Sequence, residues 1–350
     1  MILTAETISV LVLAALSFGV AMLVTPGVIW FLDRFNLGKQ IRTSDIAPIM
    51  SKLHAGKSGT PTMGGILVWG TVLILAFAFS MMANILRVEP WLSLNFLSRA
   101  ETLLPIGALF ASAIVGLVDD YLNVRKIGPH GGGLRMRHRM LSYLGIAAVG
   151  AWWFYVKLGW TILSVPLIGP VEVGAWIIPI FIFIIVATAF SVNETDGLDG
   201  LAGGVLATAF AAFGAIAFTQ GKFDLAAFCA VITGALLAFL WFNIYPARFF
   251  MGDTGSMSLG VTLGIVAMLT GGELLLPIIG FVFVLESASV IIQVASKKIR
   301  KKKVFLSAPI HHHFEAKGWP EPKVVMRFWV IAAVSAVLGL VIAILDKSFI

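Results

Sequence analysis

The sequence predicts an all-α integral membrane protein with about ten transmembrane helices, and three observations support this class. Apolar residues make up 59% of the 350 residues, and charged residues only 12%. Soluble globular domains carry about 25% charged residues, so the composition excludes that class and also a disordered chain. The apolar residues also fall in long runs, as membrane-spanning helices of about 20 residues require. We therefore expect a single polytopic transmembrane domain over residues 1–350.

Ten apolar runs follow one another along the chain. They cover residues 8–32, 62–83, 103–118, 140–157, 175–191, 201–219, 225–242, 256–270, 274–296 and 326–345. Gly and Pro interrupt several runs, which spanning helices tolerate. The runs are continuous rather than alternating, which argues against a transmembrane β-barrel. No Lys or Arg precedes the first run, so the N-terminus does not resemble a signal peptide.

The basic residues predict the orientation. Of the 25 Lys and Arg residues, 20 fall in the odd-numbered loops. By the positive-inside rule those loops are cytoplasmic and both termini are periplasmic. The expected cytoplasmic loops cover residues 33–61, 119–139, 191–200, 243–255 and 297–325. The pI near 9.6 therefore reflects topology, and we expect no nucleic-acid partner.

One outer loop has a different composition. Residues 161–173 are rich in β-branched side chains and contain the turn signal Gly169-Pro170. This pattern predicts a small periplasmic β-hairpin.

Acidic residues are scarce, and six of them gather at the cytoplasmic ends of predicted spans. They are Asp119, Asp120, Glu194, Asp196, Asp199 and Asp253. A carboxylate at the membrane edge is expensive unless it is paired or hydrated. An Asp pair is also common as a solvated helix cap, but three separate helix ends bring carboxylates to one depth. Because Mg²⁺ takes one or two carboxylates together with phosphate oxygens, we predict a magnesium site there.

Two Gly-rich segments accompany these acids. Residues 193–200 are either a turn before an Asp-capped helix or a loop that approaches a ligand closely. Residues 249–256 look like a helix start capped by Ser or Thr, whose backbone N–H groups suit a phosphate. Residues 59–65 form a weak turn signal, and the phosphate-binding spacing GxxxxGK[ST] is absent.

The run His311-His312-His313 is the most specific single feature. It is either a solvated loop or a set of hydrogen-bond donors to phosphates, because imidazole titrates near neutral pH. Mg²⁺ prefers oxygen ligands, so we do not expect these rings to hold it. The basic run 297–303 is expected to contact anionic lipid headgroups at the membrane surface.

Five segments together resemble one known family. They are HAGKSGTPTMGG (54–65), GLVDDY (116–121), NETDGLDGLAGG (193–204), FNIYPARFFMGDTGS (242–256) and APIHHHFEAKGW (308–319). The chain is similar to the bacterial phospho-N-acetylmuramoyl-pentapeptide transferases, within the polyprenyl-phosphate N-acetylhexosamine-1-phosphate transferase superfamily. The resemblance covers nearly the whole chain, and the histidine segment is its most discriminating part.

The resemblance implies a multi-pass enzyme of the bacterial cytoplasmic membrane whose active site faces the cytoplasm. It would transfer phospho-MurNAc-pentapeptide from UDP-MurNAc-pentapeptide to undecaprenyl phosphate, giving lipid I and UMP for peptidoglycan synthesis. Mg²⁺ as cofactor, contact with membrane lipids and a homodimer are implied as well.

The resemblance also implies the site residues. The expected catalytic residues are Asp119, Asp120, Asp253 and His311, with Asp253 as the metal ligand. The expected substrate-binding residues are Lys57, Thr62, Asn193, Asp196, Gly197, Leu198, Asp199, Asn243, Phe250, Ser256, His312 and His313. The chain departs from the family pattern at Asn123 and Arg139, where Lys is usual, and at Glu194, where Leu is common.

Several alternatives stay open at this point. Asp119 either orients or deprotonates the lipid phosphate for direct attack, or acts as a covalent nucleophile. Direct attack is favoured because a phosphate with a second pKa near 6 is largely ionised at neutral pH. The nearest rival function uses another donor such as UDP-GlcNAc. A secondary transporter would place its acids near the midplane, where only Glu286 lies, and a scaffold protein would have no use for clustered acids.

Overall fold

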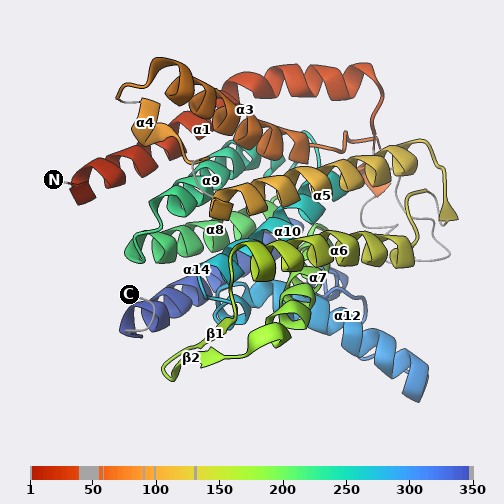
Figure 1. Cartoon of the computed structure of the whole chain (residues 1–350). Coiled ribbons are helices and arrows are strands. Elements are labelled where there is room, and N and C mark those ends of the chain that lie inside the picture. Colours follow the sequence, from red (N-terminus) through yellow and green to blue (C-terminus); the bar gives the residue numbers. More distant parts are fainter. Residues whose placement is uncertain are drawn as a thin grey trace.

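The structure of the chain is a computed structural model that describes residues 2–38, 55–57, 59–89, 91–97, 100–129 and 132–346. Within those ranges the regular structure is helical apart from one two-stranded hairpin (Figure 1). The long helices are α1 (Ile2–Arg34), α3 (Gly65–Leu86), α5 (Ala100–Val124), α6 (Met136–Trp152), α7 (Ile177–Thr195), α8 (Leu201–Thr219), α9 (Phe223–Asn243), α10 (Gly252–Leu269), α12 (Phe281–Arg300) and α14 (Glu321–Leu345). The short elements are η1 (Ala55–Lys57), α4 (Trp91–Leu94), η3 (Trp153–Lys157), η4 (Gly174–Trp176), α11 (Leu276–Ile279) and α13 (Ile310–Ala316).

Eight of the described helices are long and apolar enough to cross a membrane, namely α1, α3, α5, α7, α8, α9, α10 and α14. The class of all-helical membrane protein is therefore confirmed, whereas the count of ten spans stays a prediction. The expected span at 140–157 forms α6, which is only 17 residues long, and the π-helical turn η3. The expected span at 274–296 is divided at Gly280 into α11 and α12.

Helix α10 lies in the middle of the bundle (Figure 1), and 94% of its residues are buried. Small residues let other helices approach its backbone closely. A Cβ atom on Gly65 of α3 would overlap the backbone of Gly255, and one on Gly116 of α5 would overlap the backbone of Asp253. The first turn of α10 is thus fixed between α3 and α5, and this turn carries Asp253.

The hairpin expected at residues 161–173 is present. Strands β1 (Ile162–Val165) and β2 (Gly169–Glu172) pair antiparallel, with Ile162 opposite Glu172 and Val165 opposite Gly169. The turn itself was placed wrongly, because Gly169 and Pro170 begin β2 and Leu167 takes the left-handed conformation between the strands, with φ 66°. The backbone N–H of Ser164 donates to Glu273 at 3.0 Å, which ties the hairpin to the loop after α10.

Helices α1 and α14 place both ends of the described chain on one side of the bundle (Figure 1). Helix α5 ends at the opposite side, where α6 begins. We call this opposite side the site end. It receives the acidic segments that the sequence analysis singled out.

Candidate active site

Asp120 lies near the end of α5 and holds the start of α10. Its carboxylate accepts the backbone N–H groups of Asp253 at 3.1 Å and Thr254 at 3.0 Å. These are the second and third residues of α10, the positions whose N–H groups an N-cap side chain normally satisfies. The residue before α10, Met251, makes no side-chain cap, so the predicted Ser or Thr cap is wrong. Asp120 also occupies the position where we expected a phosphate.

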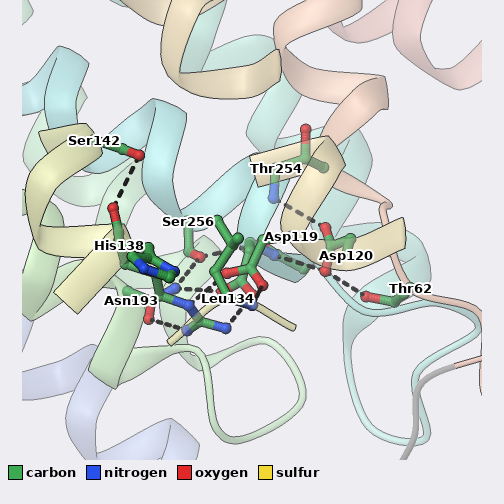
Figure 2. Close-up of polar contacts among 12 residues, drawn as sticks. Thr62, Asp119, Asp120, Leu134, His138, Ser142, Asn193, Thr254 and Ser256 are labelled. Carbon is green, nitrogen blue, oxygen red and sulfur yellow. Dashed lines mark hydrogen bonds and ion pairs between the residues drawn. The ribbon is translucent and has the colours of Figure 1, made fainter. Parts of the chain in front are cut away.

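Thr62 supports the same junction. Its hydroxyl donates to the Asp120 carboxylate at 3.5 Å (Figure 2), and its segment pairs with the loop before α10. The N–H of Phe250 donates to the carbonyl of Pro61, and the N–H of Gly64 donates to the carbonyl of Phe250, both at 2.8 Å. This pairing fixes Phe250 beside Thr62.

Asp119, one residue earlier on α5, points to a different set of partners. It is fully buried, and its Oδ1 accepts the N–H of Leu134 at 2.6 Å (Figure 2). Its Oδ2 forms an ion pair with Nε of Arg139 in the first turn of α6. Nη2 of the same guanidinium lies 2.9 Å from Oδ2 of Asp253. One arginine therefore bridges two of the predicted catalytic carboxylates.

Asn193 of α7 completes this group. Its side-chain amide donates to Oδ1 of Asp253 at 2.6 Å and to Oγ of Ser256 at 2.9 Å. Its carbonyl oxygen accepts Nη1 of Arg139 at 3.4 Å. Figure 2 shows Asp119, Asn193 and Ser256 converging on one point from α5, α7 and α10. We call Asp119, Arg139, Asn193 and Asp253 the carboxylate cluster.

A second polar group surrounds Lys57. Its ammonium lies 2.6 Å from the carboxylate of Asp199 and 2.5 Å from that of Glu321, the first residue of α14. The rings of Tyr245 and Phe250 lie within cation–π distance, at 5.8 and 5.9 Å. Oε1 of Glu321 also accepts the N–H of Asp199 at 2.7 Å. We call Lys57, Asp199 and Glu321 the lysine cluster.

The loop between α9 and α10 is held to the loop between α7 and α8. The side-chain oxygen of Asn243 accepts the N–H of Gly200 at 3.0 Å, and its amide donates to the carbonyl of Phe249 at 2.8 Å. Asp199 accepts the N–H of Ala247 at 3.0 Å. The predicted residues Asp196, Gly197 and Leu198 form the turn between the end of α7 and Asp199, and Leu198 is buried.

The three histidines lie on the short helix α13, and His311 and His312 have different acidic partners. His311 and His312 are buried, which excludes the solvated loop for these two. Nδ1 of His311 contacts Glu286 of α12 at 2.9 Å, and Nδ1 of His312 contacts Glu315 at 2.7 Å. Burial lowers the pKa of the partly exposed His313, and the charge of Lys317 acts in the same direction.

His311 packs directly against the turn after α7. A Cβ atom on Gly197 would overlap Nε2 of its ring, so only glycine leaves room for the imidazole. Nε2 of His311 is buried and has no hydrogen-bond partner among the residues that the structure describes. Through Gly197 and Asp199, the turn connects His311 to the lysine cluster.

The donor set of the carboxylate cluster fits a magnesium ion. Mg²⁺ needs one or two protein carboxylates, with water and phosphate oxygens as the other ligands. Asp119 and Asp253 supply two carboxylates directed at one guanidinium. Among the described residues no group of three or more His, Cys, Asp or Glu side chains is arranged to hold an ion by itself. The protein alone therefore does not complete the coordination, which suits an ion shared with a phosphorylated substrate.

Three residues of the site were missed as site residues. Glu321 looks like an ordinary acidic first turn of a helix, and Glu286 like an isolated acid inside an apolar run. Arg139 was noticed only as a departure from a family pattern. Charge makes all three noticeable, because charged residues are scarce in this chain, but the sequence does not show which predicted site residue each of them contacts.

Known proteins are similar to this chain along nearly its whole length. The model of glycosyl transferase family 4 matches residues 102–271, and signature 1 of phospho-N-acetylmuramoyl-pentapeptide-transferase matches residues 57–67. The phospho-N-acetylmuramoyl-pentapeptide-transferase of Chloroflexus aurantiacus is 37% identical, over 98% of this chain and 92% of the relative. That of Shouchella clausii is 39% identical, over 97% and 99%. The Geobacillus thermodenitrificans protein of the same name is 38% identical, over 95% and 97%. Identity of this extent along nearly the whole length shows that the chain belongs to the phospho-N-acetylmuramoyl-pentapeptide-transferase family.

Proposed function

We propose that the protein transfers phospho-MurNAc-pentapeptide from UDP-MurNAc-pentapeptide to undecaprenyl phosphate, giving lipid I and UMP for peptidoglycan synthesis. One observation carries the proposal. Asp119, Asp253 and Asn193 come from three different helices and meet around one guanidinium, within a chain whose curated relatives are named for this transfer. The reaction exchanges one phosphoanhydride for another, so its main demand is the neutralisation of phosphate charge.

The carboxylate cluster would receive the donor pyrophosphate. Asp253, with Asp119 beside it, would hold Mg²⁺, which when bound neutralises charge on the pyrophosphate and stabilises UMP as the leaving group. Asp119 orients the undecaprenyl phosphate for direct attack, since that phosphate is already largely ionised at neutral pH. Asp120 keeps α10 in place, because its carboxylate is taken up by the backbone of the first turn.

The lysine cluster would bind the nucleotide. Lys57 places a positive charge between the loop before α10 and the turn after α7. Phe250 beside it offers an aromatic face on which uracil can stack. Asn243 and Asp199 keep this loop and this turn together. His311 and His312 would donate hydrogen bonds toward the sugar or the phosphates.

The proposed setting is the bacterial cytoplasmic membrane. Ten crossings would leave both termini in the periplasm and the site end in the cytoplasm, as the distribution of Lys and Arg predicts. The side chains of Leu23 and Trp30 on α1 are largely exposed in the single chain, as expected of a surface that faces lipid or a second copy. A homodimer is part of the proposal.

Release of UMP tests the proposed function. Purified protein in detergent is given undecaprenyl phosphate, Mg²⁺ and either UDP-MurNAc-pentapeptide or UDP-GlcNAc. We expect UMP release only with UDP-MurNAc-pentapeptide. Release with UDP-GlcNAc but not with UDP-MurNAc-pentapeptide would favour the function of the related sugar-phosphate transferases. Asp253→Asn is expected to abolish the Mg²⁺-dependent release, and full activity in this variant would remove the metal assignment.

A chase experiment separates the two chemical routes. Protein incubated with labelled donor, without the lipid acceptor, is quenched and digested. Direct attack leaves no label on the protein, whereas a phosphorylated Asp119 would establish the covalent route.

A further inference from the structure

The guanidinium of Arg139 lies between the two carboxylates that the proposed reaction needs. Its Nε pairs with Oδ2 of Asp119, its Nη2 lies 2.9 Å from Oδ2 of Asp253, and its Nη1 lies 3.4 Å from the side-chain oxygen of Asn193. Only 16% of the Arg139 side chain is exposed. The planar guanidinium fixes both carboxylates and the Asn193 oxygen along set directions, whereas an ammonium is a point charge whose donors rotate freely.

The remaining oxygens of both carboxylates have other partners. Oδ1 of Asp119 accepts the N–H of Leu134, and Oδ1 of Asp253 accepts the amide of Asn193, each at 2.6 Å. The two Oδ2 atoms are therefore the oxygens through which the pair would contact a divalent cation. Both are directed at Arg139. A cation that uses these oxygens has to share them with a fixed positive charge or displace it.

We propose that Arg139 is a positioning residue that holds Asp119 and Asp253 together and competes with a divalent cation for their Oδ2 atoms, so that it sets the metal affinity of the site. The proposal rests on the proposed function only in taking a divalent cation as the cofactor. Without the guanidinium, the two carboxylates would repel each other. With it, they stay close and the metal is bound weakly, so that the charged donor contributes to its binding.

Metal binding without substrate tests this directly. Mn²⁺ is titrated into purified protein in detergent, and the free ion is measured by electron paramagnetic resonance. Arg139→Gln removes the competing charge and is expected to bind Mn²⁺ roughly tenfold more tightly than the parent. Arg139→Lys keeps the charge but loses the planar guanidinium, and is expected to lie between the two.

Two controls define the comparison. Arg137→Ala removes a neighbouring arginine of α6 that is exposed and whose Nε donates to His138, so its Mn²⁺ affinity should equal that of the parent. Asp253→Asn should lose Mn²⁺ binding. If Arg139→Gln unfolds in detergent, the comparison of Arg139→Lys with the parent is the test. An Mn²⁺ affinity of Arg139→Lys equal to that of the parent would overturn the proposed role of the guanidinium.

Turnover supplies the second readout. Arg139→Gln should lower kcat for UMP release even at saturating metal, because the carboxylates are no longer held together, and Arg139→Lys should restore part of it. The proposal is overturned if Arg139→Gln binds Mn²⁺ as weakly as the parent or more weakly. A parent protein that binds Mn²⁺ as described but releases no UMP would contradict the proposed function and leave the role of Arg139 intact.

Discussion

Glu286 and His311 form a pair with no exposed surface, in which Oε2 of the carboxylate lies 2.9 Å from Nδ1 of the imidazole. Burial by itself lowers the pKa of His311, but the charge and hydrogen bond of Glu286 outweigh it and raise the pKa above the usual value. Glu315 and Glu194 act in the same direction. The pair therefore favours the protonated ring and fixes its orientation against the turn at Gly197.

Glu286→Gln should show how much the charge of Glu286, as distinct from its hydrogen bond, contributes to stability. Glutamine keeps an acceptor for Nδ1 but not the charge, so the pKa of His311 should fall. A raised histidine pKa stabilises the fold most below about pH 6.5, and this contribution disappears as pH rises through the folded-state pKa. The parent should thus melt at a higher temperature than Glu286→Gln at pH 6, and the difference should shrink toward pH 9. The check is thermal unfolding in detergent.

Ser289→Ala on the same helix is the control, because the hydroxyl of Ser289 donates to the backbone carbonyl of Glu286 and not to its carboxylate. This variant should show no such trend. A difference in melting temperature between the parent and Glu286→Gln that stays constant with pH would contradict the prediction.

The adjacent acids of α5 should respond differently to substitution. Asp120→Asn removes the charge that caps α10 and should cost on the order of 1–2 kcal/mol of stability. Asp119→Asn should abolish UMP release with a smaller loss of stability, because Arg139 keeps Asp253 as a partner. Melting temperature and UMP release are measured on both variants. Equal melting temperatures for Asp120→Asn and the parent would show that the cap is not needed.

Gly116 should tolerate no side chain, because its Cα faces the backbone of Asp253 and Thr254. Gly116→Ala is expected to push α5 away from α10, to lower the melting temperature and to reduce UMP release. Gly107 lies on the same helix with nothing within 4 Å of a Cβ, so Gly107→Ala is the matched control. It should be neutral or slightly stabilising, since alanine favours a helix more than glycine does. Equal behaviour of the two variants would mean that the close contact does not position Asp253.

The stability of the protein should depend on pH through Glu273, the residue that binds the hairpin. Burial raises the pKa of Glu273 from 4.5 to about 7, so the folded protein holds a proton on this group that the unfolded chain releases. Stability should therefore fall as pH rises from 4.5 to about 7 and stay lower above it. Glu273→Gln, which still accepts the Ser164 N–H, should remove this loss and gain on the order of 3 kcal/mol over the parent at pH 8. Melting curves across pH test this. The exposed Glu172 of β2 provides a control variant, Glu172→Gln, and parallel curves for Glu273→Gln and the parent would refute the prediction.

The class of fold could be predicted from the sequence, and so could the acids of the candidate site, because both follow from local patterns. Long apolar runs identify the helices, and acids are rare enough in such a chain that Asp119 and Asp253 stand out. The division of α11 from α12 at Gly280 was not predictable, since glycine within an apolar run is common in spanning helices. It was equally impossible to predict that Asp120 caps α10, because this residue lies 133 positions before Asp253 in the chain.

The partners of the predicted residues could not be read from the sequence for the same reason. Arg139 was counted among the residues that set orientation, and nothing in its neighbourhood indicates contacts with α5 and α10. Glu286 lies among apolar residues, and only the fold brings α13 against it. Pairing between distant segments depends on tertiary structure, whereas motifs report only what one segment carries.

The salt bridge between Lys57 and Glu321 has a consequence for biosynthesis. The two residues are 264 positions apart, so the ribosome completes the first long before the second. The lysine cluster can form only after α14 has been translated and inserted, and α13 with its histidines is translated just before it. A chain interrupted before that point lacks the contacts that hold Lys57 and Asp199. If the proposed transfer needs this cluster, a chain truncated before α14 would stay inert in the membrane.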